Sequence, residues 1–322
     1  MSRDEDIKHQ HRVLSTNEEY PCVFTVCCLV TRWKDYEMAR EAFDKWGFHE
    51  TNSEFLVCDN SESNQFDAFG AIRTFLREAR GRYVVIAHQD AYPLEDCGKL
   101  LERLRCLENA DPMWGIAGNA GVDERKWPAV AGSLRMPESK GISMKIPHQK
   151  VSVLDENVLI VRNGCGITVS ADLEGYHLYG LDICSVAARL GYSSYALDYL
   201  WFHGSHGTIA EDFFTSKVKL EAKLRKYFSR MGVPTTCTYV SWSPSKWQSA
   251  LSTAKSLLQV SFSSRHRDAR SNLWQEGKRK VLFLPALVFL AIVHGPRLLA
   301  GKVYRAAQNV GLTKIKPAGS GK

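Results

Sequence analysis

The sequence predicts an α/β fold in which a mostly parallel β-sheet is flanked by helices. Apolar, β-prone runs occur at Val23–Val30, Phe55–Cys58 and Tyr83–Ala87, and segments with apolar residues at helical spacing separate them. Polar side chains, including Asp59 and Asp90, follow where these runs end. A strand, helix, strand, helix, strand order favours parallel strands joined by right-handed crossovers. Open sheets of this kind bind ligands beyond the carboxyl ends of their strands.

The rest of the chain continues this alternation. Helices are expected near residues 36–46, 69–79, 94–107, 181–190 and 211–231, and further strands at 113–117, 151–161 and 195–202, the last of which delivers His203 at its end. Residues 122 to 150 are rich in Pro, Gly, Lys and Ser, which is typical of a mobile substrate loop or a variable insertion.

Composition favours one large globular domain with an appendage, because 44% of the 322 residues are hydrophobic and 24% are charged. Nine cysteines occur, never spaced as CxxC, so the sequence indicates neither a disulfide framework nor a zinc ribbon. We interpret them as reduced core thiols of a cytoplasmic protein. A polar leader, residues 1–20, contains no apolar stretch that could serve as a secretory signal.

The basic charge is concentrated in the C-terminal tail, residues 261–322, which carries a net +10 while the preceding residues carry −3. A nucleic-acid partner for the body of the protein therefore has no electrostatic support. Within the tail, thirteen uncharged residues at 281–293 follow a basic cluster. Spanning a bilayer takes about 20 apolar residues, so this stretch is predicted to be an interfacial helix on an anionic membrane surface or a buried helix that closes the domain.

Three places along the chain offer side chains with chemical function. Asp90, with His88 and Gln89, follows the strand at 83–87, where its carboxylate suits Mg²⁺ or Mn²⁺; capping of the next turn is the structural alternative. Asp182 falls at a helix start, where the helix dipole favours an ionised carboxylate that can accept a proton; ordinary N-capping explains it equally well. His203 enters a Gly/Ser loop from which its imidazole could reach a metal held by Asp90.

The order of these motifs carries a family resemblance. DNS, HQD, the acidic pair Asp155-Glu156, HLYG-x-D-x-C and a strand ending in His-x-Ser closely resemble a bacterial branch of the glycosyltransferase family 2-like proteins, which have the GT-A fold. The likeness covers residues 21–210, leaving 211–260 as a helical extension before the tail. It implies a glycosyltransferase that moves a sugar from a UDP-, GDP- or dTDP-sugar to a saccharide or lipid-linked acceptor. Together with the basic, apolar tail, this predicts a cytoplasmic protein, either free or peripheral on the inner face of the membrane.

The resemblance also implies roles for individual residues. The nucleotide sugar is expected to contact a set of side chains at strand ends, namely Thr31, Asp59, Asn60, Gln89 and Asp90. Asp90 and His203 would hold Mn²⁺ or Mg²⁺. Asp182 would be the base of an inverting reaction, with His177 beside it in the catalytic group.

One departure from the family pattern bears on the metal. His88 stands where the family's DxD motif has its first Asp, which predicts weaker metal ligation. The pair Asp155-Glu156 is a rival for the base. Two alternative functions follow from these features: a catalytically inactive nucleotide-sugar-binding module, and a membrane-surface adaptor whose tail is the functional part.

Overall fold

The computed structural model describes residues 19–126, 129–137, 141–205, 211–228, 232–241, 246–261 and 285–286. Its elements, in chain order, are β1 (Cys22–Val30), α1 (Trp33–Lys45), β2 (Ser53–Asp59), α2 (Ala68–Glu78), β3 (Gly81–His88), β4 (Ala91–Pro93), α3 (Cys97–Ala110), β5 (Trp114–Gly118), β6 (Ala120–Val122), η1 (Glu124–Lys126), β7 (Ala131–Gly132), β8 (Leu134–Arg135), β9 (His148–Val151), β10 (Val153–Leu154), β11 (Val158–Arg162), α4 (Tyr179–Arg189), β12 (Ser193–Leu197), β13 (Trp201–His203), α5 (Glu211–Tyr227), β14 (Gly232–Pro234), β15 (Tyr239–Ser241) and α6 (Lys246–Ser261).

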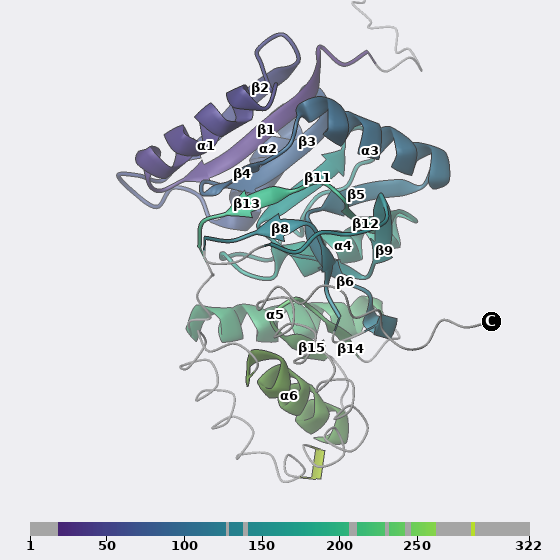
Figure 1. Ribbon diagram of the computed structural model, residues 1–322. Coiled ribbons are helices and arrows are strands. Elements are labelled where there is room, and N and C mark those ends of the chain that lie inside the picture. Colours follow the sequence, from purple (N-terminus) through teal and green to yellow (C-terminus); the bar gives the residue numbers. More distant parts are fainter. Residues whose placement is uncertain are drawn as a thin grey trace, which may run out of the picture.

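The centre of the molecule is a seven-stranded mixed sheet in the order β2-β1-β3-β11-β5-β12-β9 (Figure 1). β1 pairs in parallel with both β2 and β3, as the sequence predicts, and β12 is parallel to β5. β11 runs antiparallel between β3 and β5, and β9 is an antiparallel edge strand. The predicted α/β class, with a sheet whose strands run mostly in one direction between flanking helices, is confirmed.

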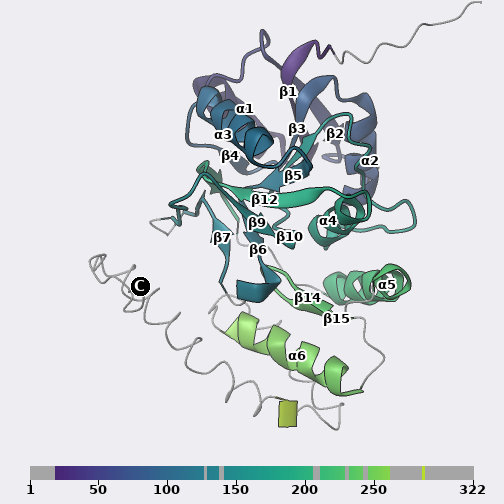
Figure 2. The same cartoon turned by 90° about the vertical axis from the view of Figure 1, so that its right-hand side faces the viewer.

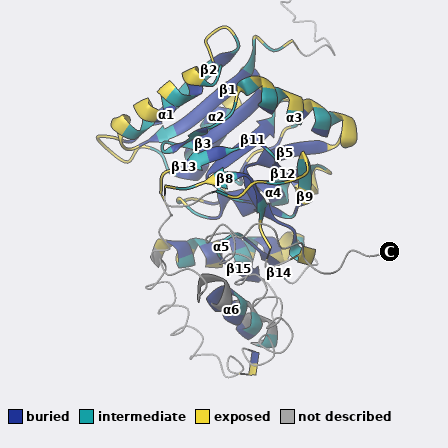
Figure 3. Ribbon diagram, viewed as in Figure 1, coloured by how far each residue is buried: buried dark blue, intermediate teal, exposed yellow. Residues whose placement is uncertain are grey.

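Helices cover both faces of this sheet (Figure 2). On one face, Phe43 of α1 and Leu100 of α3 share a buried cluster with the sheet, and on the other face Ile72 of α2 and Ile183 of α4 do the same. The central strands are buried on both sides, whereas the outer faces of α1 and α3 are exposed (Figure 3). Continuous apolar runs such as Tyr83–Ala87 have this origin, since a strand covered by helices on both faces has no solvent side.

Three expectations about the middle of the chain differ from the structure. The strand predicted at 151–161 is divided among the end of β9, β10 in a small sheet and β11 in the main sheet. The strand predicted at 195–202 is divided, because β12 ends at Leu197 in the main sheet and β13 begins at Trp201 in a small sheet of order β4-β13-β8. Between them, outside the main sheet, the Leu200 N–H donates to the Glu95 carboxylate. The segment 122–150 is more regular than predicted, since it contributes β7, β8 and the edge strand β9.

Helix α5, the β14–β15 hairpin and helix α6 lie below the sheet in the view of Figure 1. α5 inserts Phe213, Leu220 and Leu224 into the same buried cluster as α4, and β14 and β15 form a hairpin whose Val233 and Val240 join it. Helix α5 ends at Tyr227, a few residues earlier than expected. Two predictions concern segments that lie almost entirely outside the described residues. Of the polar leader only residues 19–20 are described, and of the apolar stretch at 281–293 only residues 285–286. Among the helices that are described, none has the length and apolar character to cross a membrane.

Candidate functional site

Three side chains converge where β3 and β13 end. His88 is the last residue of β3, Asp90 follows it in the turn before β4, and His203 is the last residue of β13. Antiparallel pairing of β13 with β4 sets His203 opposite Ala91, and the Gly204 N–H donates to the Asp90 carbonyl at 2.9 Å. Strand pairing therefore brings residue 203 to the turn that carries residue 90, although the two are 113 positions apart in the sequence.

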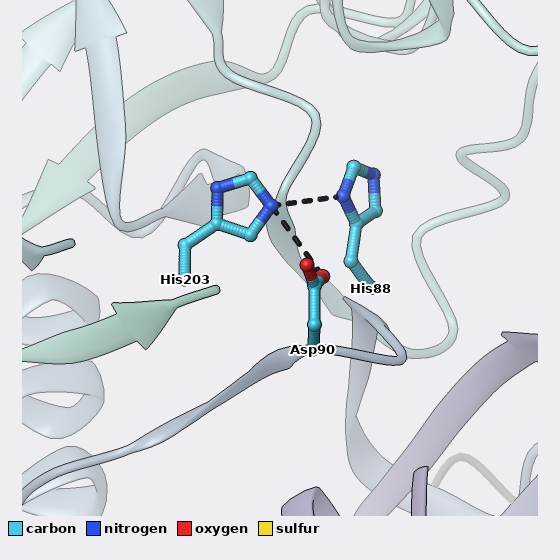
Figure 4. A group of neighbouring side chains, drawn as sticks. All are labelled: His88, Asp90 and His203. Atoms are coloured by element: carbon cyan, nitrogen blue, oxygen red, sulfur yellow. Dashed lines mark hydrogen bonds and ion pairs between the residues drawn. The ribbon is translucent and has the colours of Figure 1, made fainter. Parts of the chain in front are cut away.

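The ligand-capable atoms of this group face one another (Figure 4). His88 Nδ1 lies 3.3 Å from His203 Nε2, and His203 Nε2 lies 3.6 Å from Asp90 Oδ1. One atom from each residue lies within 4.8 Å of the other two. Metal–ligand bonds of about 2.0–2.2 Å separate neighbouring ligand atoms by about 3 Å or more, so the three atoms are spaced as a divalent cation requires.

A hydrogen-bond chain fixes which nitrogen of His88 is free. The Tyr179 hydroxyl donates to the Glu156 carbonyl at 2.9 Å, and its oxygen lies 2.8 Å from His88 Nε2. Because a carbonyl only accepts, the hydroxyl proton belongs to that bond, and His88 Nε2 must be the donor to Tyr179. Nδ1, which faces His203 and Asp90, then carries a lone pair.

The charge state of His88 suits a metal ligand as well. Desolvation of the ring, followed by the neighbouring His203, lowers the pKa of His88 to about 4, so its imidazole is neutral near pH 7. A neutral imidazole is the form that ligates metals. The donor set of two imidazoles and one carboxylate therefore fits a divalent metal ion, with His88 joining the two ligands predicted from the sequence. Where the family pattern has a carboxylate, His88 thus offers a ring nitrogen as a ligand atom.

The three side chains lie at the border between two cavities. The first, about 260 Å³, is lined by Thr31, Gln89 and Asp90 together with apolar residues of β1, β3 and α2. The second, about 290 Å³, is lined by His203, Asp155, Glu156 and His177, and also by the turn of the β14–β15 hairpin. The wall between them contains His88 and Tyr176, which line both cavities. Next to these residues, Tyr179 lines the first cavity and Leu178 lines the second. We call them the strand-end cavity and the hairpin cavity.

The predicted nucleotide-contacting residues divide into two groups. Thr31, Gln89 and Asp90 line the strand-end cavity. Gln89 also organises it, because Gln89 Oε1 accepts from the backbone N–H groups of Thr31 and Arg32 at 2.9 and 2.8 Å. Asp59 and Asn60 do not line either cavity.

The Asp59 carboxylate accepts the Ser61 N–H at 2.8 Å, and that bond lowers its pKa. Asn60 is buried, and its amide holds the loop that follows β2: Oδ1 accepts from the backbone of Gln65 and Phe66, and Nδ2 donates to the Phe66 carbonyl. All the polar groups of the Asn60 side chain are thus engaged within this loop.

The two residues predicted as catalytic are separated by the fold. His177 lines the hairpin cavity, where Nε2 lies 3.4 Å from the Asp212 carboxylate. Asp182 lines neither cavity and is only 1% exposed. Its carboxylate accepts the backbone N–H and the hydroxyl of Ser170, both at 2.7 Å, and burial raises its pKa. The geometry thus gives Asp182 an internal partner and does not bring it to the metal-binding group.

Comparison with known proteins identifies a protein that is similar to this chain in sequence. No family model matches the chain. The protein "ATP synthase subunits region ORF 6" of Fuscovulum blasticum is 34% identical over 218 residues, which cover 66% of this chain and 87% of that protein. The chain belongs to the family of this ORF 6 protein.

Solved structures give weaker likenesses to this ORF 6 family member. S. aureus TarS 1-349, in complex with UDP-GlcNAc, is 13% identical with a TM-score of 0.49 and covers 84% of this chain and 81% of its own. The mannosyltransferase PcManGT from Pyrobaculum calidifontis, in complex with GDP-Man and Mn²⁺, is 12% identical with a TM-score of 0.41 and covers 96% and 85%. Likenesses of this size do not establish an activity for this protein.

Two residues of the ORF 6 family member were missed by sequence reasoning. The sequence pattern gives His88 no ligand role, although its position two residues before Asp90 is a signal for a shared ligand set. Nothing in the local sequence marks Tyr179. Its role depends on α4 beginning beside β3, which only the fold determines.

Proposed function

We propose that this protein transfers a sugar from a nucleotide-sugar donor to a saccharide or lipid-linked acceptor with the help of a divalent cation. The observation that carries the proposal is the group His88, Asp90 and His203 at the border between two cavities at strand ends. Group transfer needs a donor and an acceptor on either side of the bond that breaks, and a charged leaving group needs a positive partner at that border.

The strand-end cavity is the proposed donor site. Its lining of apolar residues with Thr31 and Gln89 at the rim suits a flat heterocyclic base and a ribose, and Asp90 stands where the diphosphate would approach. Asp59, which is partly exposed at the end of β2, remains a proposed contact for the ribose. We infer that Asn60 supports the donor site by holding the 60–66 loop and does not touch the ligand.

His88, Asp90 and His203 would hold Mn²⁺ or Mg²⁺ on the diphosphate side. The cation, when bound, neutralises charge on the leaving nucleoside diphosphate. The hairpin cavity, on the other side of His88, is the proposed acceptor site, with His177 as a proposed contact to the acceptor. Attack from that side would invert the configuration at the anomeric carbon. Attachment of the basic tail, residues 261–322, to an anionic membrane surface on the cytoplasmic side remains a prediction from the sequence.

The test combines binding with turnover. Purified protein is titrated calorimetrically with UDP, GDP and dTDP in the presence of Mn²⁺ or Mg²⁺, and release of nucleoside diphosphate is measured from a panel of the corresponding sugars. We expect one base to bind and one of its sugars to be turned over. Asp90→Asn, which preserves size, should lose the metal-dependent part of both signals.

Two outcomes would contradict the proposal. Absence of nucleoside diphosphate binding with either metal would remove the donor site. Binding without transfer to water, monosaccharides or a lipid extract would favour an inactive nucleotide-sugar-binding module instead.

A further inference from the structure

The hairpin cavity contains an acidic residue with an unusual position. Glu156 lies in the turn between β10 and β11, and its Oε1 accepts the Gly180 N–H at 3.1 Å in the first turn of α4. Its backbone carbonyl accepts the hydroxyl of Tyr179, the residue that orients His88. One residue is therefore tied to the start of α4 by its side chain and to the metal-binding group by its backbone.

Local sequence explains why the carboxylate reaches this point. The residue that precedes α4, Leu178, has a left-handed backbone with φ of 66° and no side-chain cap. Glu156 supplies an acceptor that the capping residue lacks, and the positive end of the helix dipole favours it. A Cβ on residue 180 would lie 2.6 Å from the Leu154 carbonyl and 3.0 Å from Glu156 Cγ. Glycine at 180 thus leaves room for the Glu156 side chain at this helix start.

The surroundings make Glu156 a strong acceptor of protons. Burial, with a smaller contribution from the neighbouring Asp155, raises its pKa to about 8, although hydrogen bonds from the backbone of Gly180 and Leu178 act in the opposite direction. The other titratable groups that face it are Tyr179 of α4 and Cys237 of the β14–β15 turn. A carboxyl whose pKa lies near the working pH is more effective in general base catalysis than an exposed, weakly basic one.

We propose that Glu156 is the general base of the transfer, taking the proton of the acceptor hydroxyl in the hairpin cavity. This inference rests on the proposed function. The acceptor O–H bond breaks and its proton moves to the Glu156 carboxylate. The acceptor oxygen forms the new bond to the anomeric carbon, and the bond from that carbon to the diphosphate oxygen breaks, leaving its electron pair on the nucleoside diphosphate.

Two other acidic residues are less suited to this role. Asp182 is enclosed and paired with Ser170, away from both cavities. Asp155 lines the hairpin cavity, but its Oδ1 accepts the Asn157 N–H in the tight turn, and its charge acts on His88. We infer that Asp155 supports the metal-binding group electrostatically and does not receive the proton.

The experiment compares Glu156→Gln with the matched variant Asp155→Asn. Release of nucleoside diphosphate is followed for whichever UDP-, GDP- or dTDP-sugar the wild-type protein turns over, with water as acceptor. Loss of a general base costs about 10²–10⁴-fold in rate. We expect Glu156→Gln to lose kcat by that factor with the donor KM and nucleoside diphosphate affinity unchanged, because the introduced amide oxygen still accepts the Gly180 N–H. Asp155→Asn should lose less than about tenfold.

Chemical rescue separates a base from a structural residue. Glu156→Ala should regain part of its turnover in added formate, which can occupy the vacated space and accept a proton, whereas chloride at equal ionic strength should not restore it. Turnover of Glu156→Gln within about threefold of wild type, or a larger loss of kcat in Asp155→Asn with its Mn²⁺ affinity unchanged, would overturn the assignment. Absence of donor binding and turnover in the wild-type protein would instead overturn the proposed function. That outcome is measured on the wild-type protein alone, so it is distinct from any result obtained with the variants.

Discussion

His88 Nδ1 lies 3.3 Å from His203 Nε2, although 115 positions separate the two histidines in the chain. β3 delivers the first ring and β13 the second, and Asp90 completes the group from the turn between β3 and β4. Since His88 Nε2 is committed to Tyr179, the nitrogen that faces His203 has a lone pair. Two rings that present nitrogen ligands to one point, beside a carboxylate, form a metal-binding arrangement with its own preference among ions.

We expect Mn²⁺ to bind more tightly than Mg²⁺. Imidazole nitrogen suits transition metals, whereas Mg²⁺ favours oxygen ligands and retains water. His203→Ala should weaken Mn²⁺ binding by more than about tenfold, because even loss of an outer-shell partner has an effect of about 10–100-fold. Free Mn²⁺ measured by electron paramagnetic resonance gives the affinity. The exposed His49→Ala is the control. Equal affinities in the two variants would rule out His203 as a ligand.

Tyr179→Phe should weaken Mn²⁺ binding by about 10–100-fold without removing a ligand. The hydroxyl joins His88 Nε2 to the Glu156 carbonyl, so its loss frees the ring to rotate and to change tautomer. The same titration measures the effect, and Tyr227→Phe, at a half-exposed position of α5, is the matched control. If Tyr179→Phe binds Mn²⁺ as tightly as the wild type, the hydroxyl does not orient His88.

Gln89→Ala should weaken nucleoside diphosphate binding while leaving Mn²⁺ affinity in the absence of nucleotide unchanged. Its side chain accepts from the N–H groups of Thr31 and Arg32 and donates to Thr31 Oγ1 at 2.8 Å. Loss of hydrogen bonds worth about 1 kcal/mol each predicts a decrease of about tenfold or more. Calorimetry with and without nucleotide distinguishes the two affinities. Gln149→Ala, on the edge strand β9, should change neither.

Much of the fold follows from the apolar pattern, and the site follows only in part. The runs at 23–30 and 83–87 specify buried parallel strands, because each is apolar on both faces, and the run at 55–58 forms the partly buried parallel edge strand β2. Of their polar successors, Thr31, Gln89 and Asp90 line one cavity, whereas Asp59 and Asn60 do not. The division of the strand expected at 195–202 was not predictable in this way, since the backbone between its two parts is bonded to the Glu95 carboxylate, a long-range partner of Leu200.

Whether an acidic side chain reaches a cavity depends on packing that the local sequence does not determine. A carboxylate in the first turn of a helix has the same sequence signature whether it faces a cavity or the core, and Asp182 faces Ser170 in the core. Glu156 has no such signature, because it reaches the helix start from another element through the space left by Gly180. Periodicity assigns residues to elements, but the distance between two elements depends on packing.

Asp182→Asn should therefore lower stability and leave donor binding intact. The carboxylate accepts two hydrogen bonds from Ser170, and an amide that offers one oxygen leaves a buried donor unsatisfied, at a cost of about 1–3 kcal/mol. Urea denaturation measures the loss, and calorimetry measures nucleoside diphosphate affinity. Asp172→Asn, which removes an exposed carboxylate paired with Lys223, should cost less than about 1 kcal/mol. A stable Asp182→Asn variant with impaired turnover would return Asp182 to the mechanism.

The free energy of unfolding should also depend on pH through the raised pKa of Glu156. Its pKa is raised from 4.5 to about 8 by burial, so between these values the folded protein holds a proton that the unfolded chain has released. The contribution of this group to the free energy of unfolding must then fall as pH rises through that window. Glu156→Gln has no proton to lose, so its unfolding free energy relative to wild type should increase from pH 5 to about pH 8 and then level off. Urea titrations across this range measure the difference, with Glu50→Gln, at an exposed position, as the control. A difference that stays constant with pH would show that Glu156 ionises normally in the folded protein.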